Sequence, residues 1–183
     1  KGSLNTFELA CKELTQKEYF KTISGTSNDP LICLSLSLPS LSQTTHAQLR
    51  FELEKSAELA VSLHHLHLSD LGENEDHHLS NLVVSFDLGD ASSCEFVNYK
   101  SQSESVTFME KVNVVAHDNS SFSYVGVNLG ATLSREDICI NALGSGFDNN
   151  LSGTSILGHK DAHFVKTEIH LTVPEITSRQ LFK

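Results

Sequence analysis

The sequence predicts an all-β body after residue 30, preceded by a short helical segment, and two observations predict the strands. Apolar and polar residues alternate with period two from Leu31 onward, which turns one face of each strand toward a core. Clusters of Gly, Asn, Asp and Ser separate these short runs, as turns separate strands. A stacked solenoid and a two-sheet sandwich both have strands of this length and spacing.

Residues 1–29 have a different pattern. Their apolar residues recur at steps of three and four with Glu and Lys between them: Phe7, Leu9, Ala10, Leu14, Tyr19 and Phe20. This spacing predicts one amphipathic helix, or two short ones, up to about residue 24. The breaker cluster from Ser24 to Pro30 ends it. We therefore expect a helical segment and linker over 1–29 and the β core over 30–183.

A weak repeat runs through the β core. The segment that begins at Phe51 recurs 35 residues later at Phe86, 28 residues after that at Val114, and 26 further on at Ile140. In each copy a strand runs into a small polar elbow: Lys55-Ser56-Ala57, Gly89-Asp90-Ala91, Asp118-Asn119-Ser120 and Gly144-Ser145-Gly146. Coils that bury their apolar face by stacking on neighbours give such a recurrence.

Composition excludes two classes of function. The 183 residues carry 13 Lys and Arg against 23 Asp and Glu, a net charge of −10, so the clustered cations of a nucleic-acid binder are missing. No apolar run reaches the roughly 18 residues of a membrane-spanning helix. Because only 7% of residues are aromatic and Trp is absent, we expect an aliphatic core.

The four cysteines favour a reducing compartment. Cys11, Cys33, Cys94 and Cys139 form no CxxC pair, and the N-terminus lacks the apolar stretch of a secretory leader. We expect buried reduced thiols and a cytoplasmic location, or the plastid stroma in a eukaryote.

The histidines are the first candidates for chemistry. His64, His65 and His67 precede His77 and His78, and alternation places His65 and His67 on one face at a spacing that can ligate zinc. A polar strand end that leads into the loop after residue 70 explains the same residues without a metal, and we favour it.

No catalytic set stands out among the remaining motifs. Gly144-Ser145-Gly146 is too short for a nucleophile elbow. Glu136 and Asp137 are adjacent, so a strand would point them to opposite faces, and we expect them to cap or solvate a turn. The glycines of the second half carry no phosphate-binding motif and are expected at tight corners: Gly126, Gly130, Gly144, Gly146, Gly153 and Gly158.

Three segments near the C-terminal end resemble a known family. They are Leu129–Ile138 (LGATLSREDI), the glycine-rich stretch from Gly144 to Gly153, and Thr177–Lys183 (TSRQLFK). In this order and near this spacing they are similar to the SufB/SufD family of iron–sulfur cluster assembly proteins, and the LSR and SRQ forms look more like SufD than SufB.

The resemblance implies a right-handed parallel β-helix and a scaffold subunit that is not itself an enzyme. Such a subunit acts with SufB and the ATPase SufC, and the iron–sulfur cluster is assembled transiently on the complex. The family's cluster-site His is expected beyond Lys183, in further coils. We therefore expect no catalytic, cofactor-binding or metal-binding residue in this segment.

One segment departs from the family. Where relatives have three His before the TSRQ motif, this sequence has Lys166, Leu171 and Glu175, and His170 is one position out of register. A carbohydrate-binding or carbohydrate-active β-helix is the alternative function, and it would need a coil face lined by acidic and aromatic side chains. A sandwich-type interaction module is a third.

Overall fold

The computed structural model describes residues 17–26, 30–37, 44–67, 78–102 and 105–183, and within these ranges the chain forms twelve β-strands. Their bounds are β1 Lys17–Ile23, β2 Leu31–Ser37, β3 Thr44–Leu53, β4 Glu58–His67, β5 His78–Leu88, β6 Ser93–Gln102, β7 Val106–Ala116, β8 Ser121–Gly130, β9 Leu133–Ala142, β10 Asp148–Ile156, β11 Ala162–Leu171 and β12 Thr177–Phe182.

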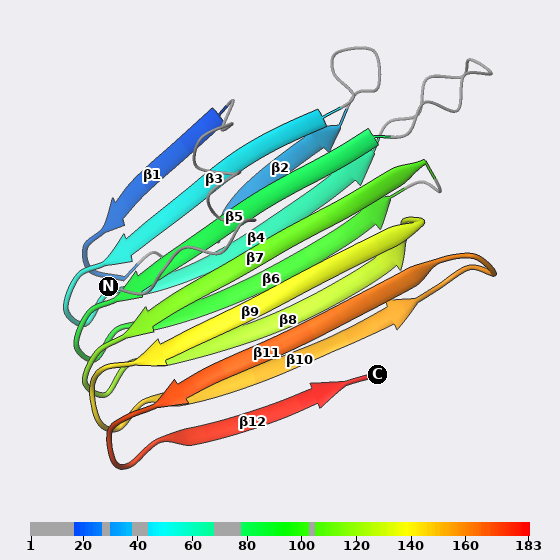
Figure 1. The fold of residues 1–183 in the computed structure, drawn as a ribbon. Coiled ribbons are helices and arrows are strands. Elements are labelled where there is room, and N and C mark those ends of the chain that lie inside the picture. Colours follow the sequence, from blue (N-terminus) through cyan, green and yellow to red (C-terminus); the bar gives the residue numbers. More distant parts are fainter. Residues whose placement is uncertain (1–16, 27–29, 38–43, 68–77, 103–104) are drawn as a thin grey trace.

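The strands alternate between two parallel sheets. One has the order β1-β3-β5-β7-β9-β11 and the other β12-β10-β8-β6-β4-β2, so each pair of consecutive strands adds one layer to the stack (Figure 1). Every strand pairing is parallel, between strands two apart in sequence. The all-β solenoid is confirmed, and the sandwich alternative is wrong.

The strand register pairs the same residues that the sequence repeat aligns. Phe51 pairs with Phe86, Phe86 with Val114, and Val114 with Ile140. The repeat lengths differ because the number of residues between consecutive strands varies, from ten between β4 and β5 to two between β8 and β9.

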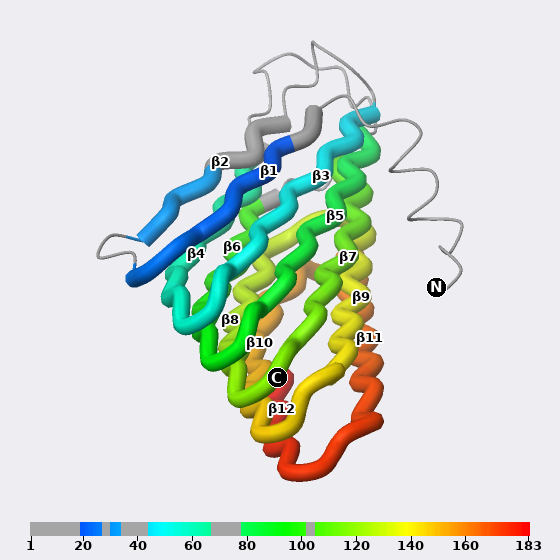
Figure 2. The backbone as a smooth tube through the Cα atoms, turned by 90° about the vertical axis from the view of Figure 1, so that its left-hand side faces the viewer, coloured from blue at the N-terminus to red at the C-terminus, as the bar shows by residue number. Residues whose placement is uncertain are grey.

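The elbows stack on one another at one end of the sheets (Figure 2). Ser56, Ala91, Asn119 and Gly146 all have positive φ there. The amide of Ser56 donates to the carbonyl of Asp90 at 2.8 Å, and that of Asn119 donates to Ser145 at 2.8 Å. Gly144 is required by close approach, because a Cβ there would lie 2.1 Å from the backbone nitrogen of Asp118.

The expected N-terminal helix is wrong for residues 17–23. These residues form β1, which pairs with β3 over its whole length and extends the solenoid toward the N-terminus. Ile23 is buried against the core, and pairing with a neighbouring strand outweighs the helical spacing of the apolar residues. Residues 1–16, which include most of that pattern and Cys11, lie outside the described residues.

The interior between the sheets is apolar near the elbows. Phe51 and Phe86 stack with ring centroids 5.2 Å apart, and Phe86 also contacts Phe96 at 5.1 Å and Phe122 at 5.4 Å. Most residues of the core are aliphatic, as expected, and several aromatic rings are buried with them, where ring pairs add to burial. Val112, Val114, Ile138 and Ile140 complete this half.

Candidate functional site

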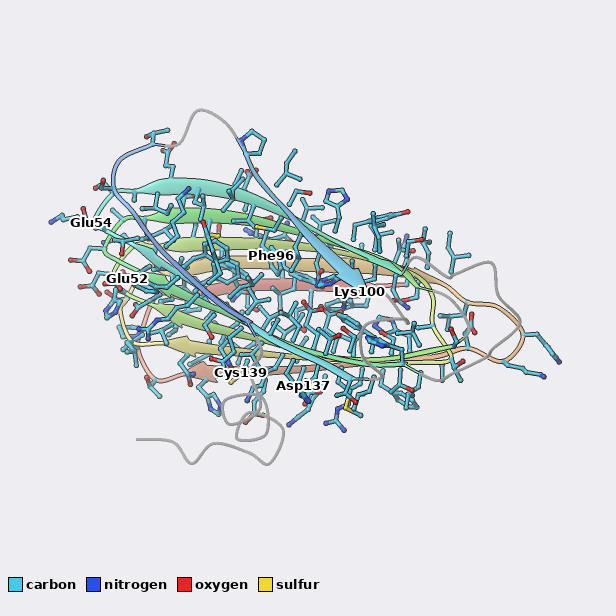
Figure 3. The ribbon with its side chains drawn as sticks, turned by 90° about the horizontal axis from the view of Figure 1, so that it is seen from above. Glu52, Glu54, Phe96, Lys100, Asp137 and Cys139 are labelled. Carbon is cyan, nitrogen blue, oxygen red and sulfur yellow. The ribbon has the colours of Figure 1, made fainter. Side chains whose placement is uncertain are left out.

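The interior becomes polar at the end of the strands away from the elbows. Along β6 the inward-facing side chains are Cys94, Phe96, Asn98 and Lys100, so the change occurs halfway along the strand. Figure 3 shows Phe96 and Lys100 between the two layers of strands, whereas Asp137 and Cys139 lie at the outer side of one sheet.

Register brings the polar residues together. His65, Lys100 and Asn128 are neighbours across β4, β6 and β8, and they form an inward-facing row on one sheet. Glu110 and Glu136 are neighbours on β7 and β9 of the other sheet. The two rows face each other across the interior.

Lys100 is held between the two carboxylates. Its Nζ lies 2.7 Å from Oε2 of Glu110 and 2.9 Å from Oε2 of Glu136, and all three side chains are at most 3% exposed. The ammonium also lies 5.4 Å from the ring centroid of Phe108. We call Lys100, Glu110 and Glu136 the buried triad.

Neutral side chains complete the hydrogen bonding of the carboxylates. Asn98 donates from Nδ2 to Oε2 of Glu110 at 2.7 Å and approaches Oε1 of Glu136 at 3.4 Å. The hydroxyl of Tyr124 donates to Oε1 of Glu136. Buried carboxylates need such partners, because an unpaired charge in this environment costs several kcal/mol.

The triad is charged. Burial by itself would raise the pKa of Glu110, but the Lys100 ammonium and His65 outweigh it and lower that pKa to about 2. Burial and the repulsion of Glu110 would raise the pKa of Glu136, yet that pKa is lowered because Lys100 and the nearby His163 outweigh them. Burial would lower the pKa of Lys100, yet the two carboxylates raise it.

Two histidines flank the triad. Nε2 of His65 lies 3.7 Å from Oε1 of Glu110, and Nε2 of His163 lies 3.8 Å from Oε2 of Glu136. Neither Nε2 makes a hydrogen bond. The side chain of His163 is 7% exposed, and its Nδ1 lies 2.6 Å from the hydroxyl of Ser155.

A cavity of about 320 Å³ adjoins the triad beside Glu136 and His163. Its wall includes Gly126 and Gly153, which are neighbours in the β8–β10 register. A Cβ on Gly126 would meet the Tyr124 hydroxyl, and one on Gly153 would meet the Phe182 ring. Asn128 also lines the cavity; this residue is 2% exposed, and neither polar atom of its amide has a hydrogen-bond partner.

The histidines considered as zinc ligands in the sequence do not gather into one site. His65 and His78 are buried, but His78 lies near Thr45 at 3.3 Å and His64 near Ser62 at 2.8 Å. The His67 side chain and all of His77 lie outside the described residues. In the described part of the chain, no group of three or more His, Cys, Asp or Glu side chains is placed to hold a metal ion.

The expectation that Glu136 caps or solvates a turn is wrong. Glu136 points to the opposite face from Asp137, as predicted, but it does not cap a turn: it lies within β9 and is 2% exposed. Gly126 and Gly153 likewise lie within strands rather than at corners. Lys100, Glu110 and Asn128 were missed, although each occupies an inward position of the period-two pattern, and a polar or charged residue in such a position was the available signal.

The cysteines of the described ranges do not form a cluster ligand set. Within these ranges, Cys33, Cys94 and Cys139 form no disulfide bond. Burial raises the pKa of Cys94, so its thiol stays protonated at neutral pH. Within the described residues, no helix has the length and apolar character needed to cross a membrane.

Comparison with known proteins identifies the family. The family model for the SUF system FeS cluster assembly SufBD core domain matches residues 37–183. The chain belongs to this family. Its parallel solenoid is consistent with the SufBD core fold, and its role is in iron–sulfur cluster assembly by the SUF system. A search of curated proteins finds no match.

The carbohydrate alternative is not favoured for this SufBD core domain. A groove on the outer face of the first sheet, of about 390 Å³, contains a single carboxylate, that of Asp87. Glycoside hydrolysis ordinarily uses two carboxylates that flank the substrate. The two that lie close together in the interior, Glu110 and Glu136, are both bound to Lys100.

Proposed function

We propose that the chain is part of a SufD-like scaffold subunit that acts in a complex with a SufB-like protein and a SufC-like ATPase. The observation that carries the proposal is the SufBD core match over residues 37–183, within which Leu129–Ile138 and Thr177–Lys183 have the SufD-like forms. The compartment that fits this role is the cytoplasm or a plastid stroma.

In this role the chain is a structural component and ATP hydrolysis occurs on the SufC-like partner. The described residues support a scaffold because Glu110 and Glu136 are both paired with Lys100 rather than free for acid–base chemistry. The iron–sulfur cluster is the product of the complex, and it forms transiently without being a resident cofactor of this segment.

Affinity capture of the tagged full-length protein tests the proposal. The SufB-like and SufC-like proteins of the source organism are co-expressed with it, alone and together. We expect both to be retained at physiological salt in a defined ratio. The control is the tagged outer-face variant Lys166→Met, whose ion pair with Glu168 is exposed and whose loss leaves the core intact. Failure of the wild-type protein to retain either partner would overturn the proposal.

A further inference from the structure

Four outward-facing side chains of the first sheet are buried. Val83 lies between two core residues of β5, so the alternation of the strand points its side chain to the outer face. Register places Lys111 of β7 beside Val83. It places His46 of β3 beside Asn81, which is two residues before Val83 and faces the same way. All four residues are at most 9% exposed, and we call them the outer patch.

The strands of the sheet by themselves do not account for this burial. Val97 and Val125 face outward on β6 and β8, which have a paired strand on each side just as β5 does. These two valines are 39% and 40% exposed, whereas Val83 is 8% exposed. A segment that is not part of the sheet therefore covers the outer patch.

The cover lies over the N-terminal part of the first sheet. Lys111, Asp137 and Lys166 are successive neighbours on β7, β9 and β11, so they form one row on the outer face. Lys111 is 9% exposed, whereas the side chains of Asp137 and Lys166 are 22% and 60% exposed. Since exposure rises toward β11, the cover extends over β3, β5 and β7 and ends near β9.

The chain enters the solenoid beside the outer patch. The row of Val83 and Lys111 continues through β3 to Glu18, the second residue of β1. Residues 1–16 are therefore tethered at the height of the patch, three strands from Lys111. Three strand spacings amount to about 14 Å, and sixteen residues reach further than this even with a helical rise of about 1.5 Å each.

The sequence of residues 1–16 suits such a surface. Phe7, Ala10 and Leu14 are spaced by three and four residues, and Lys12 falls on the opposite side of that periodicity. An amphipathic segment of this length is only marginally stable by itself and gains its stability from packing. A tether also raises its local concentration at the patch.

We propose that residues 1–16 dock on the outer patch through Phe7, Ala10 and Leu14, and that they shield this part of the solenoid from other proteins. The docking is a contact within one chain. It does not depend on the SufB-like and SufC-like partners, so its failure would leave the proposed function unaffected.

Pulsed acetylation of lysines in the isolated full-length protein, read by peptide mass spectrometry, tests the docking. Leu14→Asp places a charge in the apolar stripe and should raise the rate at Lys111 about tenfold, because the covered amine becomes accessible. Lys166, which is exposed on the same row, should keep its rate. The matched control Lys12→Gln should leave both rates unchanged.

Nuclear Overhauser effects between the Val83 methyl groups and the side chains of Phe7 or Leu14 in the wild-type protein support the docking even if Leu14→Asp fails to fold. Contacts from Val83 to residues 38–43 or 68–77 in their place would overturn the proposal, because a loop would then be the cover. A rate at Lys111 that Leu14→Asp leaves unchanged, or that falls only when a partner protein is added, would also overturn it.

Discussion

The two halves of the solenoid interior are built from the same backbone and differ in what fills them. Near the elbows lies an aromatic column in which Phe51 stacks on Phe86 and the ring of Phe96 is tilted against Phe86. Toward the other end of the same strands, Lys100 and its two carboxylates replace them. In a parallel stack, equivalent positions of successive coils lie side by side. Polar residues at one such position therefore form a continuous polar row through the interior.

The difference indicates a division of roles. Apolar burial stabilises the stack at about 25 cal/mol per Å², whereas a buried ion pair contributes little net stability against an apolar replacement. The elbow half therefore holds the coils together. The polar half contributes less net stability, and it contains the cavity and the unpartnered amide of Asn128.

The largest effect is expected in the elbow half. Phe86→Ala removes a fully buried ring that contacts Phe51, Phe96 and Phe122, and it should lower the free energy of unfolding by about 3–5 kcal/mol. Urea denaturation measures this change. A loss below 1 kcal/mol would contradict the assignment of the aromatic column as the core.

Lys100→Met removes both ion pairs of the polar half. This change leaves two buried carboxylates without their cation, and removal of one partner of a buried pair costs about 3–5 kcal/mol. We expect the residual stability to rise as the pH falls through the acid range, because protonation relieves the repulsion between Glu110 and Glu136. A variant as stable as the wild type at pH 7 would disprove the ionised triad.

The stability of the wild-type protein should depend on pH through the polar half of the interior and not through the aromatic half. Because the pKa of Glu110 is below its ordinary value of 4.5, its stabilising contribution is complete above that value and is lost as the pH falls toward 2. The pKa values of Lys100 and Tyr124 are raised, so their contributions are lost as the pH rises past about 10.

Thermal unfolding measured between pH 2 and pH 11 shows this dependence. Phe86→Ala should retain both the acid and the alkaline decline, since it leaves the triad intact. Lys100→Met should lose the acid decline. If the melting temperatures of the two variants changed with pH in the same way, the assignment of the pH dependence to the polar half would be contradicted.

The smallest effect is expected outside the interior. Lys166 and Glu168 form a pair at 2.9 Å on the outer face of β11, with both side chains about half exposed or more. Exposed pairs of this kind contribute little, so Lys166→Met should leave the melting temperature unchanged. If Lys166→Met lowered the melting temperature as much as Lys100→Met does, burial would not explain why the two ion pairs differ in their effect on stability.

The sequence located several strands of this fold and part of their register, although the pattern alone left the solenoid and the sandwich open. Alternation located the buried faces, and the recurrence of Phe51 at Phe86, Val114 and Ile140 matches the pairing. It was insufficient at β1, whose apolar spacing fits a helix equally well until a neighbouring strand is available.

The candidate site could be predicted only in part. Glu136 was noticed, but its partners Lys100 and Glu110 lie 36 and 26 residues away, and only the coil register brings them together. Periodicity marks a position as inward-facing without revealing what it faces across the interior. Gly126 and Gly153, which both line the cavity, are likewise brought together by register alone.

The role in the SUF system is tested most directly by cluster assembly itself. The SufB-like and SufC-like proteins are co-expressed under anaerobic conditions with and without the full-length protein, and iron and sulfide are measured per purified complex. The scaffold account predicts that omission of this subunit lowers both contents several-fold. Equal iron and sulfide in its absence would contradict it.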